Sequence, residues 1–349
     1  MKQNDMKVIK YEHKTEYFSS KIFDQYFGGM SFCVFDIETL GLRPMYDKLV
    51  LAGIMTVQPD GTCCLTQYFL EDAEEETYML AVLADELNKY DVILTYNGRH
   101  FDVPFITKRA EILGFEDYCI RSYNLDLYLI INGHSYFRYM LDNLRQSTVE
   151  IYMGLETSRD DDISGKESIQ LYLDFSVCKD PVKKAAIRDR ILLHNHDDIL
   201  QLYKLLPVLL QTDMHSAMNS LGFPQKGENG WPDLFVRTCR ATPQALTVSG
   251  VYSGSPVRYT SFSTPDHPFQ CEFSPEGNFT FIWPVQNLKG NVFINTRLLL
   301  GETPELEKYA GYVNGFIVLS QNNKKNLLEI NMVSKELLKK FMNTTDCNS

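Results

Sequence analysis

The stretch SFCVFDIETL, residues 31–40, contains the pattern that decides the fold class. Residues 31–36 form a run rich in aromatic and β-branched side chains that ends at an acid, as buried strands do. Side chains two apart on a strand point to the same face, so Asp36 and Glu38 converge. Two carboxylates held together suit a hard divalent cation, whereas a strand-end turn would leave both acids solvated. The apolar context favours metal binding.

The residues that follow predict an α/β domain built on this strand. Two further strands are separated by a Pro-Asp-Gly turn at 59–61 and form an antiparallel meander with the first. A second buried strand comes later, between two helices, the first of which opens on acids. The predicted elements are strands at 48–57 and 63–69, a helix at 72–89, a strand at 91–96 and a helix at 103–113.

A second acidic motif, NGRHFD at residues 97–102, directly follows the strand at 91–96. Open α/β sheets bind ligands at strand ends, which favours a place for Asp102 in the same site. The same position also suits an N-cap of the next helix. Asn97 would supply a neutral donor near the site, and Phe101 an apolar wall.

A third motif, HNHDD at residues 194–198, lies in the helical pattern that runs from Pro181 to residue 210. Residues four apart share a helix face, so His194 and Asp198 point the same way. His196 points elsewhere, and Asp197 is the second-best ligand. A histidine and an aspartate four residues apart on a helix, with no other motif beside them, are also typical of a solvated helix surface. The near-neutral pKa of histidine suits a general base.

The composition changes after about residue 212. Residues 222–232 are rich in Gly and Pro, which indicates a linker or long loop. Short β-type runs follow, the last at 326–332, and 334–342 predict a closing helix. We therefore expect four parts: an N-terminal extension at 1–29, an α/β domain at 30–212, a linker at 213–240 and a smaller β-rich domain at 241–349.

Composition bounds the function. The chain has 349 residues, 44% of them hydrophobic, which is enough for buried cores in two domains. The formal net charge of −11 argues against a long duplex held by phosphate neutralisation and favours short or transiently bound substrates. No signal peptide or membrane span is visible. The eight cysteines show no CxxC or disulfide spacing, which indicates a reducing cytoplasm.

Together, the three acidic motifs resemble those of the DEDD superfamily of exonucleases, in the same order and at fitting separations. The phrases YNGRHFDVPF, DDISGK and HNHDDILQL are most similar to the YprB-like group of RNase H-like proteins. The resemblance covers about residues 30–210 and implies a mixed five-stranded sheet flanked by helices. The third motif usually has a Tyr four residues, or a His five residues, before its Asp. Here His194 stands four before Asp198.

The resemblance implies a metal-dependent 3′–5′ exonuclease that acts on the 3′ end of single-stranded DNA or RNA. Two Mg²⁺ or Mn²⁺ ions would be held by Asp36, Glu38, Asp102 and Asp198. His194 would take the proton of the nucleophilic water. Substrate contacts are expected from Thr39, Leu40, Asn97 and Phe101. Asp126 is expected to be a helix cap near the site. The alternative is a catalytically weak or inactive module that binds nucleic acid or protein.

Overall fold

The computed structural model describes residues 6–155, 160, 163, 165–264, 268–345 and 347. The chain forms two compact units, Met1–Thr212 and Asp213–Ser349. None of the described helices combines the length and the apolarity needed to cross a lipid bilayer.

The first unit is built on a mixed six-stranded sheet in the order β1-β4-β3-β2-β5-β6. The strands β1, β4, β3 and β2 pair antiparallel, and β2, β5 and β6 pair parallel. The predicted meander is therefore confirmed, and so is the mixed RNase H-like sheet with helices around it. The strand bounds are β1 Met6–Lys14, β2 Phe32–Thr39, β3 Leu49–Val57, β4 Thr62–Leu70, β5 Val92–Thr95 and β6 Tyr123–Asp126.

The sixth strand comes from residues expected to be an N-terminal extension. Strand β1 pairs along its whole length with β4, and α1 (Lys21–Phe27) leads from it into β2. The Phe18 amide then donates to the Tyr203 hydroxyl at 2.8 Å. Strand β1 is an edge strand with mostly exposed, charged side chains, so its sequence lacks the apolar alternation that marks a half-buried strand. Backbone pairing with β4 holds it along its whole length, and only Met6 and Ile9 of its apolar side chains are partly buried against the cores.

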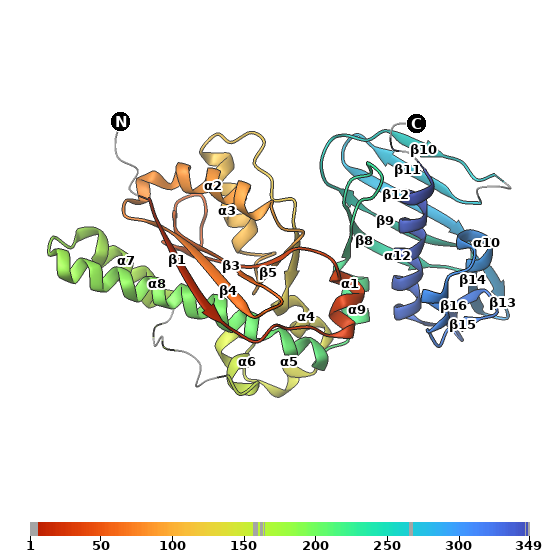
Figure 1. The fold of residues 1–349 in the computed structure, drawn as a ribbon, viewed down its shortest axis with the longest axis horizontal. Coiled ribbons are helices and arrows are strands. Elements are labelled where there is room, and N and C mark those ends of the chain that lie inside the picture. The colour runs from red at the N-terminus through yellow and green to blue at the C-terminus, as the bar shows by residue number, and fades with distance from the viewer. Residues whose placement is uncertain are drawn as a thin grey trace. The chain divides into compact units, whose positions relative to one another are not determined.

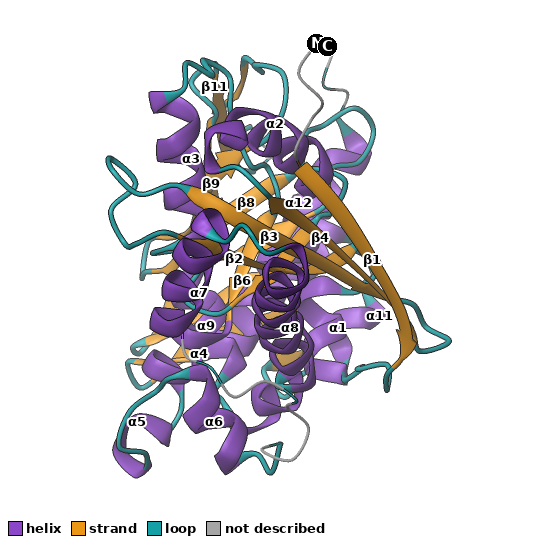
Figure 2. Ribbon diagram, turned by 90° about the vertical axis from the view of Figure 1, so that its left-hand side faces the viewer, coloured by secondary structure: helices purple, strands orange, loops and turns teal. Residues whose placement is uncertain are grey.

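Helices cover both faces of this sheet (Figures 1 and 2). Side chains of α2 (Glu76–Leu87) and α3 (Asp102–Ile112) pack on one face with Phe35 and Ile37 of β2. Side chains of α7 (Gly165–Val177) and α8 (Pro181–Lys204) pack on the other with Leu51 and Phe69. Among the described residues, the other helices of the unit are η1 Ala73–Glu75, α4 Leu127–His134, α5 Phe137–Met140, α6 Gln146–Tyr152 and η3 Leu206–Gln211.

A buried ion pair fixes the loop that follows β2. The Arg109 guanidinium on α3 donates to the Glu76 carboxylate on α2, with one contact at 2.9 Å, and also to the Pro44 carbonyl at 3.0 Å. The Glu76 carboxylate accepts the Leu49 amide at 2.9 Å. A buried charge is tolerated when it is paired and hydrogen-bonded, as both are here. The loop that joins β2 to β3 is thereby tied to two helices.

The second unit is β-rich, as expected. Its larger sheet has the order β10-β11-β12-β9-β8-β7, and a smaller one has the order β13-β14-β16-β15, with β17 paired to β16. The strands are β7 Phe223–Gln225, β8 Leu234–Ala241, β9 Ala245–Tyr252, β10 Tyr259–Ser261, β11 Gln270–Ser274, β12 Asn278–Pro284, β13 Gln286–Leu288, β14 Asn291–Asn295, β15 Tyr312–Val313, β16 Phe316–Gln321 and β17 Lys324–Lys325. The helices are α9 Met214–Leu221, α10 Thr296–Leu300, α11 Pro304–Glu307 and α12 Leu327–Thr344.

Two expectations for this unit were wrong. Residues 213–240 are not a linker, because α9, β7 and most of β8 lie there and β8 pairs with β9 in the larger sheet. Their Gly and Pro residues mark the tight connections between these elements, such as Gly222 at φ 83° after α9. Residues 326–332 are not a strand, because α12 begins at Leu327. Its buried positions Ile330, Val333, Leu337 and Phe341 recur with helical spacing.

Candidate metal centre

The first two acids project from β2 toward α8. In the register of β2 with β3, Asp36 lies opposite Gly53 and Glu38 opposite Leu51. Leu51 packs in the core under α7 and α8, while Ile37 packs in the core under α2 and α3. Alternation along β2 therefore places both carboxylates on the α8 face of the sheet. Glu38 is buried and Asp36 partly exposed.

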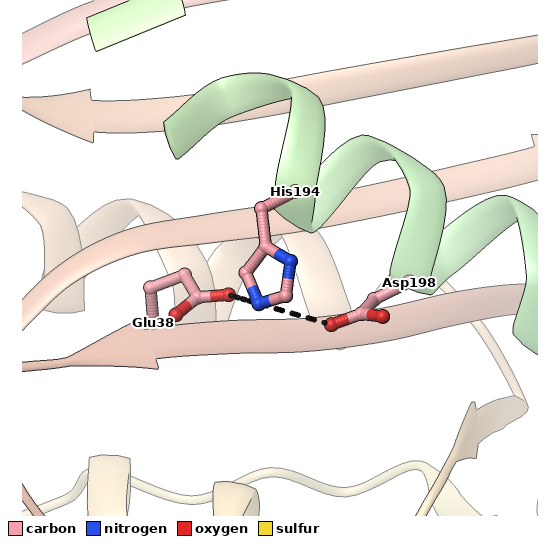
Figure 3. A group of neighbouring side chains, drawn as sticks. All are labelled: Glu38, His194 and Asp198. Carbon is pink, nitrogen blue, oxygen red and sulfur yellow. Dashed lines mark ion pairs between the residues drawn. The ribbon is translucent and has the colours of Figure 1, made fainter. Parts of the chain in front are cut away.

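Helix α8 brings His194 and Asp198 of the third motif to Glu38, as Figure 3 shows. The His194 Nε2 atom lies 3.7 Å from Glu38 Oε1 and 3.6 Å from Asp198 Oδ2. One donor atom from each of the three residues lies within 4.8 Å of the other two. His194 is 5% exposed, so the cluster sits at the sheet–helix interface rather than on the solvated side of α8. Two motifs far apart in the sequence thus meet.

Polar side chains that sequence reasoning missed hold this arrangement. Asn195 Nδ2 donates to Asp36 Oδ2 at 2.8 Å, and Ser168 Oγ of α7 donates to Glu38 Oε2 at 2.9 Å. Gln67 of β4 in turn donates to Asn195 Oδ1 at 2.8 Å and to the Leu192 carbonyl at 2.9 Å. Asn195 stands inside the HNHDD motif, next to His194. Nothing in the sequence marks Gln67 or Ser168.

The close approach of α8 depends on Gly53. A Cβ atom at this position would lie 2.4 Å from Asn195 Oδ1 and 2.2 Å from Ile199 Cδ1. Both contacts are far inside van der Waals distance, so only glycine lets the helix pack at this depth.

Asp102 lies at the start of α3, the helix that follows β5, and β5 pairs in parallel with β2. Asp102 is the first residue of α3 and is 4% exposed, and Phe101 occupies the N-cap position. The Asp102 charge raises the pKa of Asp36, which indicates that the two carboxylates lie near each other. The second motif therefore lies beside the first.

The carboxylates of the site repel one another, and this repulsion favours binding of a cation. Burial, followed by the charges of Asp102, Asp198 and Glu38, raises the pKa of Asp36 well above its ordinary value, although the Asn195 hydrogen bond opposes this. Burial also raises the pKa of Asp102 to about 7, with the nearby charge of Asp126 contributing. Carboxylates that repel one another in this way are stabilised when a divalent cation lies between them.

The loop between β5 and α3 is shaped by Asp126. This residue caps α4 by accepting the Leu129 amide at 3.2 Å, as the sequence predicted. It also accepts the amides of Asn97 at 2.9 Å and Arg99 at 3.0 Å. Asn97 has a left-handed backbone with φ 65°, so its neighbours turn sharply back toward Asp102.

The four residues expected to contact substrate occupy different surroundings. Thr39 is buried and its hydroxyl donates to the Gly41 carbonyl at 2.7 Å, and Leu40 packs against the core under α7 and α8. Phe101 lines a cavity of about 760 Å³ together with Leu42, Pro44 and Arg99. Asn97 is only partly buried. Phe101 thus borders an open cavity, whereas the Thr39 hydroxyl is turned toward its own loop.

Two residues of the third motif, His196 and Asp197, make their contacts away from the cluster. Asp197 is buried, accepts the Asp160 amide at 2.7 Å and lies 3.0 Å from His196 Nδ1. The His196 ring packs against Tyr11 and His13 of β1. Of the DDISGK phrase, residues 161, 162 and 164 lie outside the described residues.

Comparison with known protein families accounts for this arrangement. The family model of the RNase H superfamily matches residues 33–210, about half of the chain. The chain belongs to the RNase H superfamily. The matched region contains all three acidic motifs and ends just before the second unit.

Other comparisons add less to this RNase H superfamily chain. A search of curated proteins returned no match. Among solved structures, the family B DNA polymerase from the hyperthermophilic archaeon Pyrobaculum calidifontis is similar at 21% identity, with a TM-score of 0.39. The similarity covers 55% of this chain and 26% of that polymerase.

Proposed function

We propose that this chain is a metal-dependent 3′–5′ exonuclease of the DEDD type, in the YprB-like group, which degrades single-stranded DNA or RNA. The observation that carries the proposal is the meeting of Glu38, His194 and Asp198 within 4.8 Å, in a member of the RNase H superfamily. The direction of degradation and the preference for single strands rest on the resemblance of the three motifs. A cytoplasmic location belongs to the same proposal and rests on the cysteine spacing.

The carboxylates fit hard divalent ions such as Mg²⁺ or Mn²⁺. Asp36, Glu38 and Asp198 would hold one ion, and Asp36 with Asp102 would hold a second. Bound there, two ions supply Lewis-acid chemistry: a nucleophilic water of lowered pKa and a stabilised leaving 3′-oxygen.

The chain's own residues position both the acids and the substrate. Asn195 and Ser168 each hold one carboxylate oxygen, so the remaining oxygens keep a fixed orientation. Phe101 offers an aromatic face to a terminal base at the edge of the 760 Å³ cavity. Arg99 lines the same cavity and supplies a positive charge for a phosphate.

Digestion of end-labelled single strands tests the proposal. With Mn²⁺, the wild type should shorten 5′-labelled DNA or RNA stepwise, should release labelled mononucleotide at once from a 3′-labelled strand, and should leave a circular strand intact. Asp198→Asn should lower the rate by at least about a hundredfold, because a ligand charge is lost. Asp174→Asn, the same change at an exposed position on α7, should not alter it.

The alternative is a binding module without turnover, and the net charge of −11 favours it because such a surface attracts few phosphates. Binding of Mn²⁺ without degradation of any linear strand would support this alternative. Cleavage of the circular strand would instead make the chain an endonuclease.

A further inference from the structure

The position of the His194 ring assigns it a part in holding the metal. We propose that His194 Nε2 is itself a ligand of one ion, beside Glu38 and Asp198, and that this nitrogen makes the site select transition-metal ions over Mg²⁺. The inference rests on the metal site of the proposed function, but not on its nuclease activity. It gives His194 a ligand's role in place of the general-base role expected from the sequence.

The distances between the three donor atoms suit a shared ion. Ligand atoms lie about 2.0–2.2 Å from such ions, so neighbouring donors are about 3 Å apart and opposite donors about 4 Å apart. The Nε2 atom lies 3.7 Å from Glu38 Oε1 and 3.6 Å from Asp198 Oδ2, between these two values. Small rotations of the three side chains would bring their donor atoms to bonding distance from one ion.

The three donors also come from fixed positions. His194 and Asp198 lie one turn apart on α8, so their spacing follows from helix geometry. The Glu38 Oε2 atom is held by Ser168, and it is the other oxygen, Oε1, that faces His194. His194 is 5% exposed and lies between Leu192, packed in the core, and Asn195, bonded to Gln67. Such a supported set is preorganised for a ligand.

A general base would need a different position. A base must reach the water bound to an ion, so its nitrogen lies about 2.6–3.2 Å beyond that water and outside the ligand atoms. The His194 nitrogen instead lies among the carboxylate oxygens. Without an ion, the ring faces these two carboxylates favourably only when Nε2 carries a proton, as in the ion pairs that Figure 3 marks, and a bound cation would take the place of that proton.

A nitrogen donor changes which ions the site prefers. Mg²⁺ favours oxygen donors, whereas imidazole suits transition ions, and the affinity of such sites rises along the first-row series from Mn²⁺ to Cu²⁺. We expect Mn²⁺ to bind at least about tenfold more tightly than Mg²⁺. His194→Gln should lower Mn²⁺ affinity by about tenfold or more while changing Mg²⁺ affinity less.

Pulsed EPR of Mn²⁺ bound to the tag-free full chain tests the assignment directly. The wild type should show coupling of the ion to a nitrogen nucleus, and the signal should change frequency when the chain is labelled with ¹⁵N-histidine. His194→Gln should lose the coupling, and the matched control His196→Gln, on the same helix but packed against Tyr11 and His13, should keep it.

The labelled wild type needs no substitution, so the test survives if His194→Gln fails to fold. Bound Mn²⁺ without histidine nitrogen coupling, or coupling that persists in a folded His194→Gln chain, overturns the inference. Failure of the wild type to bind Mn²⁺ overturns both the inference and the proposed function. Nitrogen coupling without any strand degradation overturns the nuclease alone and supports the inference.

Discussion

At the scale of single residues, the site is dominated by carboxylates that are costly to keep together. Asp36 is opposed by three neighbouring acids, and only the Asn195 amide favours its charged form. The same charge that would bind an ion therefore destabilises the metal-free fold. Removing the Asp36 charge should therefore weaken metal binding and stabilise the metal-free chain.

Asp36→Asn should abolish stabilisation by Mn²⁺ and raise the stability of the metal-free chain. The amide can still accept the Asn195 hydrogen bond through its oxygen, so the geometry is kept while the repulsion is lost. We expect the free energy of unfolding at neutral pH to rise, because the buried charge that the neighbouring acids oppose is removed. Urea unfolding with EDTA and with Mn²⁺ measures both effects. A variant less stable than the wild type in EDTA contradicts the prediction, and Asp174→Asn serves as control.

The raised pKa of Asp102, at about 7, predicts how metal-free stability depends on pH. An unfolded aspartate titrates near about 3.9, so between the two values the folded chain binds more protons than the unfolded chain. The free energy of unfolding should therefore fall as pH rises from about 4 to about 7, by up to about 1.4 kcal/mol per pH unit from this group. Above about pH 7 the contribution should be constant.

Comparison with Asp102→Asn isolates this effect. The difference in unfolding free energy between variant and wild type, both in EDTA, should widen in favour of the variant over the same pH range. Carboxyl groups far from the site cancel in that difference, whereas Asp36, whose pKa the Asp102 charge raises, contributes to it as well. A difference that stays flat across the range would show that Asp102 titrates normally.

At the scale of elements, the site exists because α8 packs closely on β3. The glycine opposite Asp36 lets Asn195 and Ile199 approach the sheet, and the Gln67–Asn195–Asp36 chain of hydrogen bonds then links β4, α8 and β2. The Gln67–Asn195 bond is buried and the Asn195–Asp36 bond is partly buried, so a partner left without its bond would carry a desolvation cost.

Gly53→Ala should displace α8 and weaken the metal site. The added methyl group meets Asn195 and Ile199 at impossible distances, and overpacking of this kind costs about 1–3 kcal/mol. We also expect Mn²⁺ affinity to fall, because His194 and Asp198 move with the helix. Unfolding and calorimetric titration measure the two effects.

Gly133→Ala is the matched control for this substitution. A Cβ at this position in α4 meets nothing within 4 Å, so the same change should leave Mn²⁺ binding intact. It should stabilise the chain by about 0.4–1 kcal/mol by reducing the freedom of the unfolded state. Equal effects of the two substitutions on Mn²⁺ binding would contradict the role of Gly53.

At the scale of the whole molecule, the first unit contains every residue of the candidate site. The site residues run in sequence from Asp36 to Asp198, and the first unit ends at Thr212. Both cores that flank the sheet are formed by residues before position 200.

A fragment that ends at Thr212 should therefore fold cooperatively and bind Mn²⁺. Its affinity should lie within about threefold of that of the full chain, since no ligand is lost, a difference of less than about 1 kcal/mol. Calorimetric titration of the two proteins gives the comparison. Loss of Mn²⁺ binding in a folded fragment would show that the second unit contributes to the site.

The sequence alone determined the type of fold and the three acidic motifs of the first unit. Strand alternation paired Asp36 with Glu38, and helix periodicity paired His194 with Asp198, because both patterns are local and periodic. It also identified Asp126 as a cap, since capping chemistry is local. Edge strand β1 and the helix α9 escaped prediction, because one is held by backbone pairing and the other lies beside Gly- and Pro-rich turns.

Only the tertiary structure decided how these local patterns meet. The depth at which α8 packs depends on Gly53, and the orientation of the acids depends on Gln67, Asn195 and Ser168, which come from three different elements. Such contacts join residues more than a hundred positions apart, and no periodicity within one element encodes them. The position of His194 among the carboxylates, from which its role as a ligand is inferred, follows from that packing.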